Sequence, residues 1–246
     1  MDFLGLMRVK FGGEFIEEVL EAQHFCEKII VLNNYSADNT KEICAKFKNV
    51  QVIDTPFPDT YGEGRDKEFL CDLALQENPK WICHVQEDEV LERDTYEKLK
   101  PYINDRDVRC IEVHSLNYWN DDKTLRVDGA VGKGFRQTFW KYPGRKLTWD
   151  PMHCSLPREL CGIPMIQPGI ALWHYGFMNA ERRLRTNTIM RRADSEPRDY
   201  RWPLQGDPGG EDKSVNLTGE PFRLQSVDDF LVGKPYSRRA REYNES

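Results

Sequence analysis

Three consecutive acidic residues, Glu87, Asp88 and Glu89, carry the strongest chemical signal in this 246-residue sequence. They follow Gln86 and the apolar run 81–85, which is typical of a buried strand. Adjacent carboxylates repel one another unless a cation or a proton offsets their charge. Carboxylates at the carboxyl end of a strand in an open α/β sheet also lie where such folds bind ligands. The pattern therefore favours a divalent-metal site facing a diphosphate. The alternative is that the acids occupy the first turn of a following helix, where the helix dipole favours them.

Two further polar clusters follow apolar runs of strand type. The run 26–32 ends in Asn33 and Asn34, and the run 50–53 ends in Asp54. Because the carboxyl ends of parallel strands meet at one edge of a sheet, we expect these side chains to share a crevice with the acidic cluster. A ligand that lies across three strand ends is long, and a nucleotide with attached groups has that length.

Several common motifs are missing from the sequence. The first predicted strand is not followed by the GxGxxG run of dinucleotide-binding enzymes, and no P-loop run ending in Gly-Lys-Ser/Thr occurs. A Gly-x-Ser-x-Gly nucleophile elbow is absent too, which disfavours an α/β-hydrolase.

Charge is distributed unevenly along the chain. Residues 1–100 hold 12 Lys and Arg against 21 Asp and Glu, whereas residues 101–246 hold 23 against 20. An acidic first part and a locally basic second part fit a metal site that faces an anion clamp. They do not provide the broad basic face of a protein that holds duplex DNA by charge.

The seven cysteines are an odd number, are scattered and form no CxxC pair. This pattern is typical of free thiols in a reducing cytoplasm, which is the expected location. No run approaches the ~18–20 apolar residues of a transmembrane helix.

The elements that must position these residues are predicted by hydrophobic periodicity. Strands are expected at 4–10, 26–32, 50–54, 81–85 and 110–114, and helices at 14–23, 40–47, 65–76 and 94–102. Strands that alternate with helices in this way predict βαβ units and a parallel sheet. Further along, two strands are expected within 129–149, a last apolar strand or turn at 170–176 and a basic helix at 180–192.

The order of these motifs resembles the family 2 glycosyltransferases, which have the GT-A fold and use nucleotide-sugar donors. Residues 33–40, Asn-Asn-Tyr-Ser-Ala-Asp-Asn-Thr, are similar to the run Asp-Asp/Asn-Gly-Ser-x-Asp-x-Thr that commonly ends the second strand of the family. Residues 86–89, Gln-Glu-Asp-Glu, resemble the family's Asp-x-Asp metal motif, which is often written Asp-Ala-Asp-Glu.

Three other segments extend the resemblance over roughly residues 8–190. Residues 9–16 are similar to the opening strand and its acid-bearing loop, and 132–136 resemble an Arg-bearing segment upstream of the acceptor loop. Residues 172–176, Leu-Trp-His-Tyr-Gly, resemble a late His-Tyr/Ser-Gly element. The resemblance implies a Rossmann-like, mixed but mostly parallel α/β sheet flanked by helices.

The expected division of the chain follows from the same resemblance. A glycosyltransferase domain would span 1–193, with a nucleotide-sugar-binding half at 1–115 and an acceptor-binding half at 116–193. Residues 194–246 would form a charged, Pro/Gly-rich C-terminal extension, expected as surface coil.

The resemblance also implies roles for individual residues. Asp88 would be the principal ligand of Mn²⁺ or Mg²⁺, with His174 as a late ligand and Glu89 in support. A satisfied core histidine is the alternative for His174. The remaining donor contacts would come from Asn33, Asn34, Asp54, Arg65, Gln86, Glu87, Arg182 and Arg185. Asn33 and Asp54 would contact the base and ribose, and Arg182 and Arg185, with Arg183, would clamp the diphosphate. For these arginines a solvated helix face is the alternative.

Two positions depart from the family pattern. Gln86 replaces the first acid of the metal motif; it can hydrogen-bond a ribose but is a poor metal ligand. Asn33 replaces the first acid after the second strand. An asparagine can both donate and accept, whereas an aspartate only accepts. Uridine is therefore the default base, with cytidine or another base left open.

The catalytic base of an inverting transfer has to lie within hydrogen-bond reach of the acceptor hydroxyl. Asp150 and His153, in an aromatic loop, and Glu112, at a strand, are the candidates. The acceptor hydroxyl could belong to a glycan, a lipid, a protein or a modified nucleobase, and the enzyme would be a hexosyl- or pentosyltransferase.

Three alternatives remain open on the sequence alone. A non-catalytic nucleotide-sugar or carbohydrate-binding protein would explain Gln86 and Asn33. A metal-dependent phosphodiesterase or phosphotransferase would explain the acidic cluster. The residues His153, Cys154, Cys161 and His174 are soft enough for a zinc site, although their spacing fits no common zinc motif.

Overall fold

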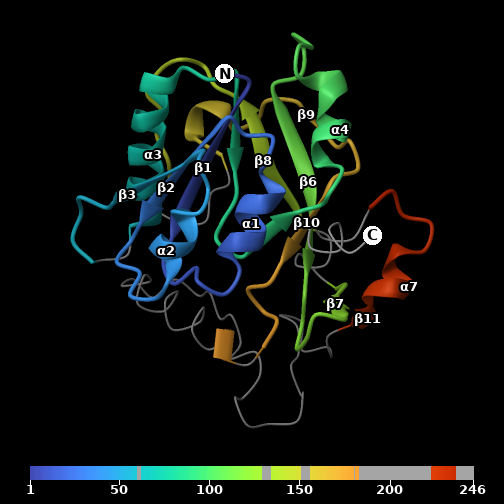
Figure 1. Cartoon of the computed structure of the whole chain (residues 1–246). Coiled ribbons are helices and arrows are strands. Elements are labelled where there is room, and N and C mark those ends of the chain that lie inside the picture. Colours follow the sequence, from blue (N-terminus) through green and yellow to red (C-terminus); the bar gives the residue numbers. More distant parts are fainter. Residues whose placement is uncertain (60–61, 129–133, 151–155, 180, 183–222, 237–246) are drawn as a thin grey trace.

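Nine strands of the described residues form a single mixed sheet (Figure 1). The computed structural model describes residues 1–59, 62–128, 134–150, 156–179, 181–182 and 223–236. The nine strands are β1 (Phe3–Val9), β2 (Lys28–Asn33), β3 (Val50–Asp54), β4 (Trp81–His84), β5 (Glu89–Leu91), β6 (Cys110–Asn117), β8 (Phe135–Lys141), β9 (Met165–Ile166) and β10 (Ala171–His174). Their order is β3-β2-β1-β4-β8-β6-β10-β5, with β9 beside β6.

Most strand pairs in this sheet are parallel. The pairs β2–β3, β1–β2, β1–β4, β6–β10 and β6–β9 are parallel, and β4–β8, β6–β8 and β5–β10 are antiparallel. Strands β1, β2, β3, β4, β6 and β10 consequently end at one edge of the sheet. The expectation of a mixed, mostly parallel α/β sheet is confirmed.

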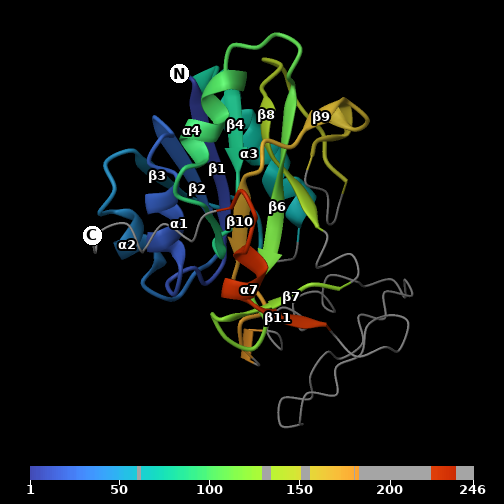
Figure 2. The ribbon, with the colours of Figure 1, turned by 90° about the vertical axis from the view of Figure 1, so that its right-hand side faces the viewer.

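Helices cover both faces of the sheet (Figure 2). They are α1 (Ile16–Ala22), α2 (Thr40–Cys44), α3 (Glu63–Glu77) and α4 (Thr95–Leu99), followed by a 3₁₀ turn at Lys100–Tyr102; another 3₁₀ turn spans Arg158–Leu160. Side chains of β1 alternate between the two faces: Met7 packs with Val19 of α1, whereas Leu6 packs with Leu70 of α3. Burial on both faces explains why β1 and β2 read as continuous apolar runs in the sequence.

The sheet has to curl because the link between β4 and β5 is too short to cross a flat sheet. Only residues 85–88 separate β4 from β5, although four strand steps lie between these strands in the sheet order. In a flat sheet four steps cover about 19 Å, and the link would reach about 18 Å only if fully extended. Because the link contains a turn at 87–88, it is shorter than that. The curl brings the end of β10 to the end of β4.

The position of strand β5 rules out one interpretation of the acidic cluster, its placement in the first turn of a helix. Glu89 begins β5, which pairs with β10, and the next helix, α4, begins only at Thr95. The first-turn alternative for the three acids is therefore wrong. A three-residue strand that pairs with a segment eighty positions downstream has no local sequence signal.

The described part of the C-terminal extension is not coil. Residues 223–236 contain β11 (Leu224–Ser226), which pairs with β7 (Thr124–Arg126), and α7 (Val227–Leu231). Val227 is buried against the main core, and Ser226 caps α7 by accepting from Asp229 N. Of the strands expected within 129–149, only β8 falls among the described residues; of the helix expected at 180–192, only residues 181–182 do.

Candidate functional site

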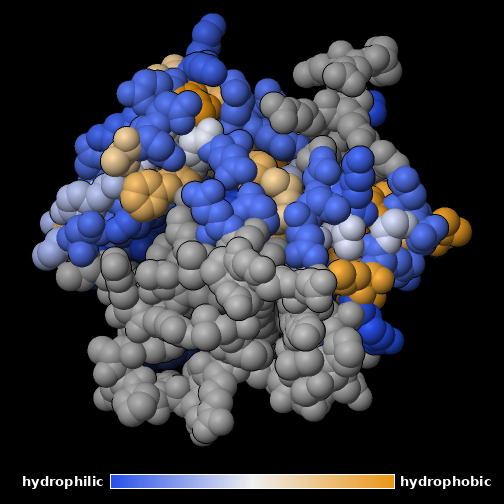
Figure 3. All heavy atoms as spheres, turned by 90° about the horizontal axis from the view of Figure 1, so that it is seen from below, coloured by the Kyte–Doolittle hydropathy of each residue, from blue (hydrophilic) through white to orange (hydrophobic). Residues whose placement is uncertain are grey.

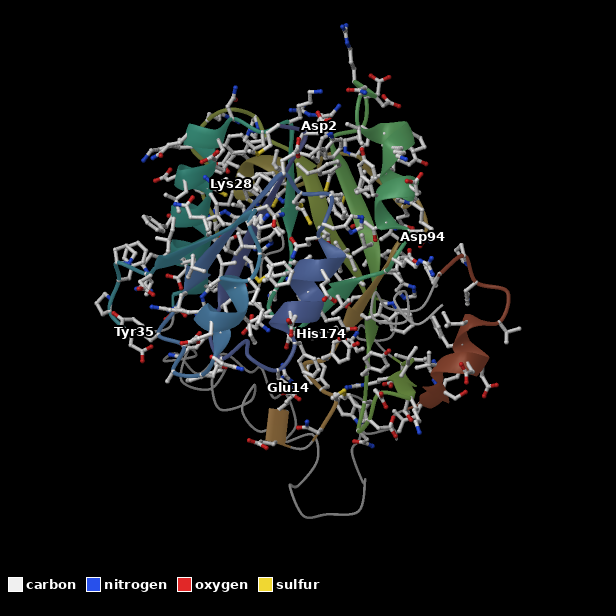
Figure 4. All side chains as sticks on the ribbon, viewed as in Figure 1. Asp2, Glu14, Lys28, Tyr35, Asp94 and His174 are labelled. Atoms are coloured by element: carbon white, nitrogen blue, oxygen red, sulfur yellow. The ribbon has the colours of Figure 1, made fainter. Side chains whose placement is uncertain are left out.

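The carboxyl ends of the parallel strands gather the polar residues expected from the sequence. Figure 4 shows Glu14, Tyr35 and His174 at this edge, with Asp2 and Lys28 at the opposite one. Seen onto this edge (Figure 3), the surface of the described residues is largely hydrophilic, with scattered hydrophobic side chains. These polar residues therefore lie at the edge where an α/β sheet binds ligands.

Asp88 and His174 meet at the centre of this edge. His174 Nε2 lies 3.7 Å from Asp88 Oδ1, and both side chains are partly buried. The backbone holds the pair together, because Tyr175 N donates to the Asp88 carbonyl at 2.9 Å. Burial lowers the pKa of His174; the Asp88 charge opposes this effect, and Arg136 and Arg182 add to it. A neutral imidazole beside a carboxylate is a suitable pair of ligands for a divalent cation.

The backbone of Gly176 packs closely against this pair. A Cβ built on Gly176 would lie 2.5 Å from His174 Nε2 and 3.2 Å from Asp88 Oδ2. Real Cβ atoms do not approach a ring nitrogen that closely, so glycine is required there by close packing. The glycine of the Leu-Trp-His-Tyr-Gly segment thus has a spatial role that its sequence position alone did not reveal.

Arg182 lies against the other oxygen of Asp88. Its Nη2 is 3.2 Å from Asp88 Oδ2, its Nη1 is 2.6 Å from Glu14 Oε2, and its guanidinium lies 4.5 Å above the Phe15 ring. The side chain is only 5% exposed. The guanidinium is therefore held by two carboxylates, those of Asp88 and Glu14.

Glu89 is the register partner of His174 on β5, but other groups bind its carboxylate. Its Oε2 accepts from Gln86 N at 2.8 Å and its Oε1 accepts from Arg136 Nη1, and the side chain is fully buried. Both oxygens are therefore used to fix the turn after β4 and to pair with β8. This geometry favours a structural role for Glu89 over its expected role as a ligand.

Glu87 lies on the other side of the turn. Its Oε1 accepts weakly from Lys10 N at 3.5 Å. Burial, with the adjacent Asp88 charge, raises the pKa of Glu87 to about 7, and Arg8 opposes the shift. The three acids after β4 thus have three different environments, and Asp88 alone among them pairs with His174.

Asn33 and Asp54, at the ends of β2 and β3, are register partners. Asn33 Nδ2 donates to Asp54 Oδ1 at 2.7 Å, and Asn33 Oδ1 accepts from Ser36 N at 3.2 Å. Lys41 also pairs with Asp54 at 2.7 Å. Hydrogen bonds from Lys41 and Asn33 lower the pKa of Asp54, whose side chain remains 67% exposed. The carboxylate missing at Asn33 is therefore present on the next strand.

Replacing Asn33 by aspartate should weaken nucleotide binding, although aspartate is the common family residue. The new carboxylate would face Asp54 across a distance that now holds a hydrogen bond, so a donor is lost and a repulsion is gained. We expect nucleoside diphosphate affinity to fall about tenfold, measured by calorimetry. Asn33→Asp with Asp54→Asn restores one donor and one acceptor and should recover most of the loss; an unchanged affinity in the single variant would contradict this account.

Asn34 and Arg65 meet on the buried Asp66. Asp66 accepts from Arg8 Nε at 2.7 Å, Asn34 Nδ2 at 2.9 Å and Arg65 Nη2 at 2.9 Å, and its side chain is fully buried. Arg65 also lies 4.3 Å from the Phe57 ring. The cluster ties the start of α3 to the ends of β1 and β2, which makes Asn34 a framework residue, with Arg65 partly exposed at its rim.

The three candidates for the catalytic base lie in separate parts of the chain. Asp150 is partly exposed and pairs with Arg158 at 2.5 Å, and the neighbouring Trp149 packs beside His84 at the end of β4. Glu112 is bound by Gln137 and, at 3.0 Å, by Gln167, and lies five positions before the end of β6. Glu112 is thus not brought together with Asp88. His153 and Arg185 lie outside the described residues.

The residues present fit a divalent cation. Asp88 offers hard carboxylate oxygens and His174 offers Nε2, and Gly176 adds no side chain that would press on either group. Within the described ranges, no three His, Cys, Asp or Glu side chains converge on one point. Mg²⁺ and similar ions commonly use one or two protein ligands and complete their shell with phosphate oxygens and water. Half of the alternative zinc set, His153 and Cys154, lies outside the described residues.

The described cysteines are all free, and five of the six are buried. Burial raises the pKa of Cys44 to about 11 and of Cys71 to about 12, so these thiols are inert. In the same part of the chain, no helix combines the length and apolarity needed to cross a membrane.

Four residues of the site were missed by the sequence reasoning: Glu14, Asp66, Asn117 and Gly176. Asn117 ends β6, and its Oδ1 lies 2.6 Å from His174 Nδ1. The signal that could have found it is the same as for Asn33, a polar residue that ends an apolar strand. Asp66 carries no such signal, because it lies inside a helix.

Comparison with known proteins agrees with this geometry. Residues 11–156 match the model of the family described as Glycosyl transferase family 2. No curated protein sequence matches the chain.

Several solved structures are similar in fold. TarS 1–349 from S. aureus aligns at 14% identity and a TM-score of 0.45, over 58% of this chain and 47% of that one. Its complex with UDP-GlcNAc aligns at 17% and 0.42, over 48% and 35%. Glucosyl-3-phosphoglycerate synthase from Mycobacterium tuberculosis, in complex with Mn²⁺, UDP and glucosyl-3-phosphoglycerate, aligns at 14% and 0.35, over 47% and 43%. The chain spans less than half the length of each of these proteins.

Proposed function

Because the chain belongs to glycosyl transferase family 2, we propose that it transfers a sugar from a nucleoside diphosphate donor to an acceptor hydroxyl. The observation that carries this proposal is the meeting of Asp88 and His174 at the sheet edge that also presents Asn33 and Asp54. A carboxylate–imidazole pair and a nucleotide-sized row of polar strand ends are the parts that donor binding requires.

A divalent cation, Mn²⁺ or Mg²⁺, would be held by Asp88 and His174. When bound, such an ion neutralises the charge that develops on a leaving diphosphate. Arg182 would then contact phosphate oxygens, because its guanidinium already lies next to Asp88. The partly buried Arg136 pairs with Glu89 behind the turn after β4 and balances the charge of that acid. The remaining expected contact, Arg185, stays a prediction.

The nucleoside would lie over the ends of β2 and β3. Asp54 is the exposed acceptor there and is suited to a base N–H, with Asn33 orienting it. Uracil carries such an N–H, so a uridine diphosphate sugar is the proposed donor. Arg65 and Gln86 would contact the diphosphate or the ribose.

The acceptor half would supply the base for an inverting transfer. Asp150 is the strongest described candidate because Trp149 anchors its loop beside the end of β4. His153 remains the second candidate and Glu112 the third. The acceptor hydroxyl, whether on a glycan, a lipid, a protein or a modified nucleobase, is left to experiment.

A panel of nucleoside diphosphate sugars, with and without Mn²⁺, tests the proposal. We expect one uridine diphosphate sugar to raise the melting temperature only with the metal, and to release uridine diphosphate slowly by hydrolysis. Binding without nucleotide release under any metal would favour a non-catalytic sugar-nucleotide binder. Cleavage of a phosphodiester substrate would favour a phosphodiesterase. Either result would contradict transferase activity.

Replacing Gly176 by alanine should weaken metal-dependent donor binding about tenfold while the protein remains folded. The new Cβ would press on His174 Nε2 and crowd Asp88 Oδ2, so the ring has to move away from the carboxylate. Gly162→Ala is a useful control for glycine replacement, because a Cβ at this left-handed glycine meets no neighbour, so its cost is local backbone strain. Equal donor affinities in the two variants would contradict the spatial role of Gly176.

A further inference from the structure

The last residue of β6 faces the ring of His174. Asn117 and His174 are register partners on the parallel pair β6–β10, so their side chains project from the same side of the sheet. Asn117 Oδ1 lies 2.6 Å from His174 Nδ1, and Asn117 is buried. This contact is shorter than the 3.7 Å between the ring and Asp88.

A hydrogen bond from the amide nitrogen of Asn117 supports the orientation of its side chain. Its Nδ2 donates to the Ser115 carbonyl at 3.4 Å, which leaves Oδ1 toward the ring. An amide oxygen only accepts, so His174 Nδ1 has to carry the hydrogen. On a neutral imidazole the lone pair is then on Nε2, the nitrogen that faces Asp88 at 3.7 Å.

Asp88 would impose the opposite arrangement if it acted alone. A carboxylate beside Nε2 is an acceptor, so it favours a hydrogen on Nε2 and a closed His174–Asp88 hydrogen bond. In a pair closed in this way the lone pair of the ring is on Nδ1, which faces Asn117, and none remains on the side of Asp88 for a cation. Two acceptors therefore compete for one ring hydrogen, and the distances of 2.6 Å and 3.7 Å favour Asn117.

We propose that Asn117 is a positioning residue that holds His174 in its Nδ1–H tautomer, so that Nε2 stays an open acceptor beside Asp88. Hydrogen bonds from the outer side of a ligating histidine are known to fix its tautomer and orientation. The assignment of the tautomer does not depend on the proposed function. Only the purpose of the free Nε2, which is to bind a divalent cation together with the donor, rests on that function.

The tautomer can be read directly by nitrogen NMR of ¹⁵N-histidine-labelled protein, without metal or donor and at mildly alkaline pH. We expect the wild-type His174 signals to show a protonated Nδ1 and an unprotonated Nε2. Asn117→Leu, which removes the acceptor at similar volume, should move the hydrogen to Nε2. Asn117→Asp, which keeps an acceptor, should retain the wild-type tautomer. Asn104→Leu, at an exposed position, controls for the same change of residue type.

Titration with Mn²⁺ alone, followed by electron paramagnetic resonance, gives the second readout. We expect Asn117→Leu to weaken Mn²⁺ binding about 10–100-fold, and Asn117→Asp to remain close to wild type. An Nε2–H tautomer in the wild-type protein overturns the proposal even if Asn117→Leu does not fold. An unchanged tautomer in a folded Asn117→Leu protein overturns it as well. If the tautomer of His174 changes with the residue at position 117 but the protein binds no Mn²⁺, the tautomer proposal is supported. That result contradicts only the proposed function.

Discussion

Asp88→Asn is expected to lower the rate of sugar transfer by about 10²–10⁴-fold while leaving the fold intact. The amide has nearly the same shape but no charge, so it loses the attraction for a divalent cation and for Arg182, whose Nη2 lies 3.2 Å from Asp88 Oδ2. A loss of about 3–5 kcal/mol of transition-state stabilisation corresponds to this rate change. Initial rates of nucleotide release at saturating Mn²⁺ measure the effect.

A matched variant separates the site from general charge effects. Asp107→Asn makes the same chemical change at an exposed position just before β6, at the opposite edge of the sheet. Its rate should remain within about twofold of wild type, because exposed charges away from the site contribute little. If Asp88→Asn retained more than about a tenth of the wild-type rate, the assignment of Asp88 to the metal would be wrong.

Asp66→Ala is expected to reduce the free energy of unfolding by about 3–5 kcal/mol, the usual cost of removing one partner of a buried ion pair. Asp66 is fully buried and accepts from Arg8, Asn34 and Arg65. Without the carboxylate, the Arg8 guanidinium loses its partner in a largely buried position. Urea denaturation at neutral pH measures the change.

Helix α3 offers the control for this prediction. Asp72 is on the same helix, and its ion pair with Lys146 is solvent-exposed at 3.2 Å. Asp72→Ala should change the free energy of unfolding by less than about 0.5–1 kcal/mol. Equal losses in the two variants would show that the effect comes from the helix and not from the buried cluster.

The first part of the fold could be predicted from the sequence because its signals are local. The apolar runs of β1, β2 and β4 are buried on both faces, and each is followed by polar residues that mark the end of the strand. The helices between them show apolar residues at helical spacing. Periodicity and turn chemistry act within a few residues, so they survive in a single sequence.

The parts of the fold that could not be predicted depend on contacts between segments that are distant in the sequence. The strand β5 exists because residues 89–91 pair with β10, and β11 exists because it pairs with β7. The residues of the candidate site also divide into those that could be predicted from the sequence and those that depend on distant contacts. The resemblance led us to expect Asp88 and His174 at one site. The ion pair of Glu89 with Arg136 and the hydrogen bond of Asn33 to Asp54 could be predicted only by knowing which strands are neighbours.

The pairing of β5 with β10 also determines the order in which the molecule can be completed. The edge that carries Asn33 and Asp54 is built from β2 and β3, whose contacts join segments near one another in the chain. The corner formed by Asp88 and His174 joins residues whose separation is a third of the chain, and contacts of that kind form slowly because a long loop has to close first. During synthesis the edge formed by β2 and β3 can fold before residues 171–174 leave the ribosome, and the corner formed by Asp88 and His174 cannot. The appearance of Mn²⁺ affinity in a refolding protein should therefore be among the last events, after the burial of the tryptophan of β4.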